Sequence, residues 1–201
     1  MNQNMQTQPV QREYQSVWHT SQSQVRGCLL ALSQSPATST TAATEVHDVK
    51  TDLIAALYGL HFKVQPLILN ISVQSQMTET SPIWVEQSQK LTADEFDTEL
   101  HKVIQYFEID SFCIIHIEHG EAKICIGHQQ QQSHSHIPVD QVEQILQEKF
   151  YGLCVAEDIP LIGRTYHMEV DVEYRRSFEP QTNLGKMARD IRIKNILERM
   201  N

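Results

Sequence analysis

The chain has 201 residues, a formal net charge of −9 and 40% hydrophobic residues, which suit one domain with a tail better than two full domains. A pI of about 5.5 argues against a surface devoted to nucleic acid, because phosphate binding needs concentrated Lys and Arg. No run approaches the roughly 20 apolar residues of a membrane span, and the four cysteines form no Cys-x-x-Cys pair. We therefore expect a cytoplasmic protein with reduced thiols, no cofactor and no membrane partner.

Residues 1–48 are predicted to form a largely disordered arm. Gln, Ser and Thr dominate it, and eight of the 22 glutamines precede residue 35, so the arm cannot offset its ordering entropy by burying apolar area. Two apolar islands, residues 14–18 and 28–32, interrupt it. Each island could be a first helix that packs on the domain, a segment that folds on a partner, or an inert part of the arm.

A single folded domain is expected from residue 49 to residue 201. Four apolar residues on one face predict a helix over residues 51–60. Alternating apolar residues predict a strand over residues 64–73, and a shorter strand follows at residues 83–85. We expect these two strands to be antiparallel neighbours.

A helix over residues 92–107 has the strongest local signals in the chain. Thr92 and Glu95 have the spacing of a capping box, and Leu91 and Phe96 have that of a hydrophobic staple. An unbroken apolar stripe continues to the end of this helix. The helix is therefore expected to dock on a sheet.

Residues 111–117 and 122–128 are predicted to pair as a hairpin about the turn at residues 119–120. One register makes a face wholly apolar, whereas a slip by one residue would mix the faces. Its cross-strand pairs are Ile117 with Ala122, Ile115 with Ile124, and Cys113 with Ile126. The polar stretch from residue 129 to residue 137 is interpreted as a loop.

The remaining elements are a helix over residues 140–151, a long half-buried strand over residues 164–178, and a basic helix over residues 182–201. The order α-β-β-α-β-β-α-β-α predicts an α+β fold whose antiparallel-rich sheet is covered by helices. In element order alone, without a shared motif, it resembles the acidic dimeric secretion chaperones.

Five of the ten histidines lie between residues 116 and 136. A zinc or nickel site needs three or four imidazoles or thiolates that converge on the ion, and nothing in the spacing imposes that convergence. We therefore expect no metal, and interpret the stretch as a solvated loop. The weak candidate ligands are His116, His128, His134 and His136.

Asp110, Glu121 and Lys123 resemble the restriction-endonuclease-like motif in their order. In that chemistry two carboxylates hold Mg²⁺ and the lysine orients the attacking water. Glu121 directly follows a tight turn, however, and surface ion pairs explain the same residues. A small metal-dependent nuclease or hydrolase is therefore an alternative function. Whether the protein is an enzyme stays open, and the sequence favours a non-enzymatic function.

Charge is distributed unevenly along the chain. Residues 175–201 carry seven basic and three acidic side chains, a net charge of +4, so residues 1–174 carry −13. The apolar stripe of the last helix also changes sides near Arg192. Either the helix bends so that both stripes pack on its own domain, or its first half docks on its own domain and its last two turns dock on another subunit or protein. The two stripes are Leu184, Met187, Ala188 and Ile191, and then Ile193, Ile196, Leu197 and Met200.

These features favour a non-enzymatic protein-binding, adaptor or chaperone-like protein that engages another protein or a second copy of itself. It would act through the flexible arm and the basic, two-faced helix. A nucleic-acid-linked regulator using Arg189, Arg192 and Lys194 is the last alternative. The predicted partner-binding residues are Arg189, Arg192, Ile193, Ile196, Leu197 and Met200.

Overall fold

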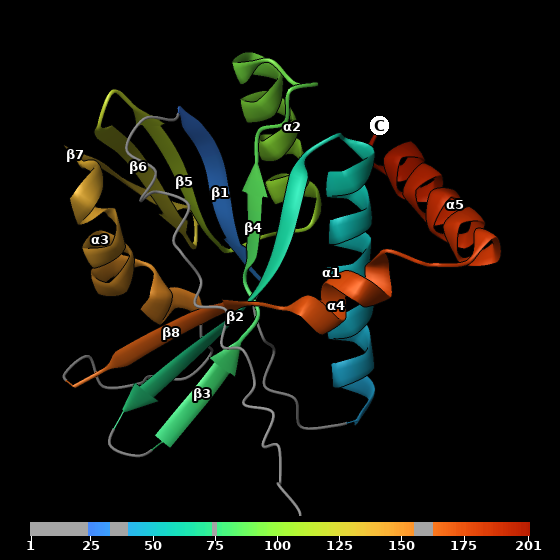
Figure 1. Cartoon of the computed structure of the whole chain (residues 1–201), viewed down its shortest axis with the longest axis horizontal. Coiled ribbons are helices and arrows are strands. Elements are labelled where there is room, and N and C mark those ends of the chain that lie inside the picture. The colour runs from blue at the N-terminus through green and yellow to red at the C-terminus, as the bar shows by residue number, and fades with distance from the viewer. Residues whose placement is uncertain (1–23, 33–39, 74–75, 155–162) are drawn as a thin grey trace, which may run out of the picture.

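The computed structural model describes residues 24–32, 40–73, 76–154 and 163–201, and these form an α+β fold with eight strands and five α-helices (Figure 1). The predicted disorder of residues 1–23 and 33–39 and the first apolar island lie outside the described residues. In chain order the elements are β1 (Val25–Ala31), α1 (Thr40–Gly59), β2 (Lys63–Val73), β3 (Gln76–Thr80), β4 (Ile83–Glu86), α2 (Ala93–Tyr106), β5 (Ser111–Glu118), β6 (Glu121–His128), β7 (Gln131–Pro138), α3 (Val142–Lys149), β8 (Thr165–Val170), α4 (Val172–Phe178) and α5 (Asn183–Met200).

The described strands form one antiparallel sheet with the order β3-β2-β4-β1-β5-β6-β7, and β8 also pairs with β2. Strand β2 pairs with β4 through its first half and with β3 through its second half, in the same register. The backbone N–H of Leu67 donates to Pro82 O at 2.9 Å between the two halves. Strands β3 and β4 are therefore one hairpin arm, interrupted at residues 81–82, and β8 lies along the other edge of β2.

The strongest local predictions are confirmed. The Thr92 side chain caps α2 by accepting from the Glu95 backbone N–H, and the Glu95 carboxylate accepts a hydrogen bond from the Thr92 backbone N–H at 2.8 Å. Strands β5 and β6 pair in the predicted register. His119 and Gly120 have φ angles of 54° and 82°, the left-handed conformations that a tight type I′ hairpin turn needs at both positions.

Both faces of the sheet bury apolar side chains. One face packs against α3 and the short 3₁₀ helix Tyr151–Cys154 that follows it. The other face packs against α1, α2 and part of α5 (Figure 1). Among the described helices, none combines the length and hydrophobicity needed to cross a lipid bilayer.

Strand β1 corrects the prediction for the second apolar island. The sequence places residues 28–32 in the arm, as a helix or a partner-binding segment, but Val25–Ala31 forms a strand between β4 and β5. Leu29 and Leu30 are fully buried, on opposite faces of the sheet. A strand that is buried on both faces is a continuous apolar run without alternation, so its pattern is the same as that of a short buried helix.

Strand β7 corrects the predicted loop at residues 129–137. Residues Gln131–Pro138 pair with β6 along its whole length and form an edge of the described sheet. Most of the strand is exposed. Its polar composition therefore reflects an edge position and not an absence of regular structure.

The predicted strand over residues 164–178 is wrong in its second half. Strand β8 ends at Val170, and Asp171 caps helix α4 by accepting a hydrogen bond from Tyr174 N at 2.9 Å. The same carboxylate lies 3.8 Å from the ammonium of Lys50, which is 4.3 Å from the centre of the Tyr174 ring. These contacts end the strand, because an Asp side chain that satisfies the first backbone N–H groups favours a helix start.

Candidate functional site

Helix α5 docks on the domain through its second half. Ile196 is fully buried, and its neighbours on this face pack around it. A Cβ atom at Gly59, the last residue of α1, would lie 2.6 Å from Cγ2 of Ile193 and 2.9 Å from Cδ1 of Leu197. The close approach of the helices therefore requires the glycine. We call this side of α5 the anchor face: Ile193, Ile196, Leu197 and Met200.

Two ion pairs join the anchored part of α5 to α1. Asp52 Oδ1 lies 2.6 Å from Arg192 Nε, and Asp52 Oδ2 lies 3.6 Å from Arg199 NH2. All three side chains are partly exposed, so each pair stabilises the fold by no more than about 1 kcal/mol. The ion pairs orient the helix, while burial of the anchor face supplies most of the docking energy.

The first half of α5 exposes a second apolar face, which we call the outer stripe: Leu184, Met187, Ala188 and Ile191. Leu184 is 78% exposed, Met187 62% and Ile191 57%. At about 100° per residue the outer stripe lies roughly opposite the anchor face. This corrects both sequence alternatives, because the outer stripe does not pack on the domain and the last two turns of the helix do.

None of the six predicted partner-binding residues therefore belongs to the outer stripe. Ile196 has no exposed surface, and Arg192 contacts Asp52. Arg189 contacts its neighbour Asp190 at 3.1 Å, and Lys194 lies 3.8 Å from Glu198. In the sequence of α5 alone, the two apolar stripes are equally good candidates for docking on the domain. The docked stripe is identified by the contacts of α5 with Gly59 and Asp52 of α1.

A second candidate site is the part of the sheet that α2 leaves uncovered. Strands β5, β6 and β7 align their side chains in rows across this face. One row, from β1 to β7, is Arg26, His116, Lys123 and His136. The next row holds Ile114, Cys125 and His134.

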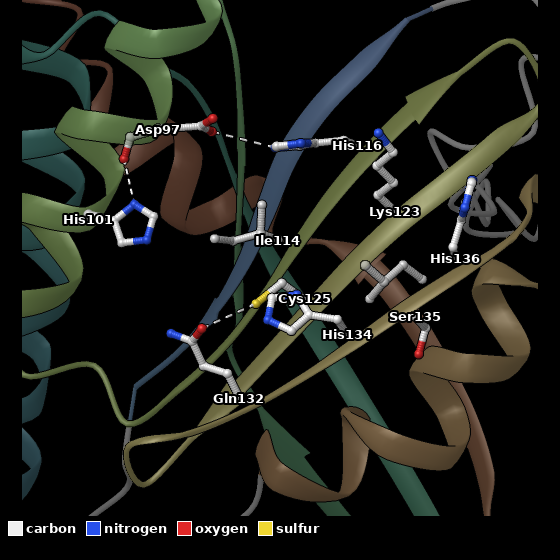
Figure 2. Close-up of a pocket in the computed structure, with 11 residues that line it drawn as sticks. Asp97, His101, Ile114, His116, Lys123, Cys125, Gln132, His134, Ser135 and His136 are labelled. Carbon is white, nitrogen blue, oxygen red and sulfur yellow. Dashed lines mark hydrogen bonds and ion pairs between the residues drawn. The ribbon is translucent and has the colours of Figure 1, made fainter.

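These rows and one side of α2 enclose an open pocket of about 590 Å³ (Figure 2). Asp97 and His101 of α2 form its wall, whereas the strand residues form its floor. We call it the sheet-face pocket. Three of the four weak metal-ligand candidates line the pocket: His116, His134 and His136. His128 lies at the end of β6, where its ring shares a 2.8 Å hydrogen bond with Ser111 Oγ.

Asp97 neutralises part of the positive row. Its carboxylate contacts Arg26 and lies 3.5 Å from Nε2 of His116. That Nε2 atom is buried and makes no hydrogen bond within the described residues. Burial lowers the pKa of His116, and Arg26 and Lys123 lower it further against the opposing effect of Asp97.

The lowered pKa of His116 predicts a pH-dependent stability. The unfolded chain takes up a proton at this histidine at a higher pH than the folded chain, so the free energy of unfolding falls as the pH drops below about 6.5. Urea unfolding at pH 7 and pH 5 should show a larger loss for the wild type than for His116→Asn. The matched control is His119→Asn in the exposed turn, which should lose as much as the wild type. Equal losses in wild type and His116→Asn would contradict the prediction.

The structure does not bring the predicted nuclease residues together. Asp110 immediately precedes β5, where Ser111 pairs with His128, whereas Glu121 pairs with Glu118 at the other end of the hairpin. At about 3.3 Å per strand residue, the eight residue steps from Asp110 to Glu118 span roughly 26 Å. Lys123 lies in the sheet-face pocket without Asp110. In the described part of the chain, no three His, Cys, Asp or Glu residues are grouped so that they could hold a metal ion.

The four cysteines are free thiols. Burial raises the pKa of Cys28, Cys113 and Cys154, and to a lesser extent that of the half-buried Cys125 in the sheet-face pocket. A raised pKa disfavours the thiolate, which is the nucleophilic form. These side chains therefore act as small apolar groups, three of them in the sheet and Cys154 in the 3₁₀ helix that packs on it.

Comparison with protein-family models, curated proteins and solved structures gives no match for this chain. The function is therefore inferred from the geometry of α5 and of the sheet face.

Proposed function

We propose that this chain is a non-enzymatic protein-binding module, of an adaptor or chaperone-like kind, whose contact surface is the outer stripe of α5. The observation that supports this most strongly is the exposure of Leu184, Met187 and Ile191 on one face of a helix that is held by its other end. Three large apolar side chains grouped on an exposed face are typical of an interaction site.

The size of the stripe sets the kind of contact. Burying a Leu, Ile or Met side chain contributes about 1.5–3 kcal/mol, so the three together contribute at most about 9 kcal/mol. Association costs about 4–15 kcal/mol in lost translational and rotational freedom. The contact is therefore expected to be reversible rather than a permanent interface, unless further surfaces join it.

The spacing of the stripe favours a second copy of this chain as the partner. The positions 184, 187, 188 and 191 have the same spacing in both directions, so an antiparallel pair of α5 helices matches Leu184 with Ile191 and Met187 with Ala188. At the centre of this pairing, Met187 of each copy meets the small Ala188 of the other. Lys186 and Arg189 lie about 150° from the centre of the stripe, so these like charges do not face each other. The pairing is isologous, as two-fold dimers require.

The test replaces the stripe with Ser at Leu184, Met187 and Ile191 and measures the molar mass by light scattering across a range of concentrations. We expect the wild-type mass to rise towards that of a dimer with a dissociation constant on the order of 0.1–1 mM. The triple variant should stay at 23.1 kDa with an unchanged circular dichroism spectrum.

The matched control is Met77→Ser on β3, where a methionine is 69% exposed outside α5. This variant should associate as the wild type does. If the wild type stays monomeric and co-purifying proteins are recovered equally by the wild type and the triple variant, the outer stripe is not a protein-binding surface and the proposal fails.

A further inference from the structure

The sheet-face pocket has the properties of a small-molecule site that is separate from the outer stripe of α5. Its volume of about 590 Å³ falls within the range of about 300–1,000 Å³ that is usual for ligand pockets. It is open to solvent, and β5, β6, β7 and α2 all contribute side chains (Figure 2). Three strands of a sheet and a capped helix form a rigid frame for a ligand.

The floor of the pocket offers apolar contact. Most of its lining surface is apolar, and Ile114 and Cys125 lie side by side there on β5 and β6. Cys125 Sγ is 3.9 Å from Oε1 of Gln132. A flat or branched hydrocarbon group on this floor would remove apolar surface of both partners from water.

The lining holds one acidic and one basic side chain, Asp97 and Lys123. Asp97 is neutralised by an ion pair with Arg26, which lies outside the lining, whereas Lys123 makes no ion pair within the described residues. Lys123 lies between His116 and His136 in its row, and imidazole N–H groups can donate hydrogen bonds beside the ammonium. Lys123, His116 and His136 extend along one side of the pocket in Figure 2, while Cys125 and His134 lie together beside them.

We propose that this pocket binds a small organic carboxylate, with an aromatic or branched aliphatic body on Ile114 and Cys125 and with the carboxylate at the Lys123 ammonium. A charge-assisted hydrogen bond to Lys123 selects the anion, and the apolar floor selects the body. The site does not depend on α5, so it stands or fails separately from the protein-binding function.

The test uses 1-naphthoate and its neutral analogue 1-naphthamide as probes, with EDTA present so that trace metals cannot bridge the histidines. The full chain is labelled at the isoleucine δ-methyl groups, and the Ile114 signal is assigned with Ile114→Val. We expect the Ile114 methyl to shift on titration with 1-naphthoate, with a dissociation constant of about 0.1–1 mM for a probe of this size.

Variants separate the charge contact from the apolar contact. Lys123→Met should weaken 1-naphthoate about tenfold and change 1-naphthamide by no more than about twofold. Lys90→Met, which removes an exposed lysine outside the pocket, is the matched control and should change neither. Gln132→Trp, at an exposed lining position, should block both probes.

Three outcomes would overturn the proposal. These are an unshifted Ile114 methyl at saturating 1-naphthoate, equal effects of Lys123→Met and Lys90→Met, and undiminished binding of both probes by Gln132→Trp. In each case the carboxylate site is absent, whatever the light-scattering test of the outer stripe shows.

Discussion

Replacing Leu29 by alanine is expected to lower the free energy of unfolding by about 3 kcal/mol, the middle of the range for fully buried leucines. Leu29 has no exposed surface, and its cross-strand partners are Trp84 on β4 and Cys113 on β5. The truncation leaves a cavity next to the Trp84 indole. This cavity cannot collapse, because strands on both sides hold β1 in place. Urea unfolding followed by circular dichroism measures the change.

The same substitution at an exposed site is the control. Leu184→Ala in the outer stripe, where the leucine is 78% exposed, should change the free energy of unfolding by no more than about 0.5 kcal/mol, measured at a concentration where the chain is monomeric. Equal losses at the two positions would mean that β1 is not a central strand.

Replacing Ile196 by alanine is expected to cost about 3 kcal/mol, whereas replacing Ile191 should cost less than about 0.5 kcal/mol. The two residues lie on one helix and undergo the same chemical change, so helix propensity affects them equally. Ile196 is fully buried and Ile191 is 57% exposed. The difference between the two losses therefore measures which half of α5 docks on α1.

A third variant tests the contact between the helices. Gly59→Val places side-chain atoms where Ile193 and Leu197 now approach the backbone, so it should displace the anchor face and make Ile196→Ala nearly neutral in that background. If Ile191→Ala costs as much as Ile196→Ala in the monomer, both stripes pack on the domain, which contradicts the exposure of the outer stripe.

The elements that could be predicted from sequence are those with local signals. The capping box at Thr92 and Glu95 involves residues three apart, and the hairpin at residues 119–120 joins strands that are adjacent in the chain. In both cases the partners of each residue follow from a fixed spacing, which a single sequence contains. Seven of the described elements lie within a few residues of their predicted ranges: β2, β4, α2, β5, β6, α3 and α5.

The elements that were missed depend on distant partners. Strand β1 is a strand because β4 and β5, more than 50 residues further along, supply hydrogen bonds to both its edges. Its flanking Gln, Ser and Thr residues indicate disorder instead. Strand β7 pairs with its neighbour in the chain, β6, but its composition conceals it. An edge strand tolerates polar residues on both faces, so it lacks the alternation that predicts a strand.

The sheet-face pocket depends on strand β7 and on the position of α2. The sequence shows a cluster of histidines, and the correct register of β5 and β6 already places His116 opposite Lys123. Only the addition of β7 brings His134 and His136 to the same face, and only the position of α2 supplies the wall. A solvated loop was therefore predicted where the structure has an open sheet face.

The proposal that the outer stripe contacts a second protein chain is tested most directly by photo-cross-linking. The photoreactive residue p-benzoylphenylalanine replaces Met187 in one full-length variant and Met77 in another, both at exposed methionine positions. We expect a cross-linked dimer from position 187, with the adduct mapped to α5 of the other copy, and no dimer from position 77. Equal cross-linking at both positions, or none at position 187 with any protein, would contradict it.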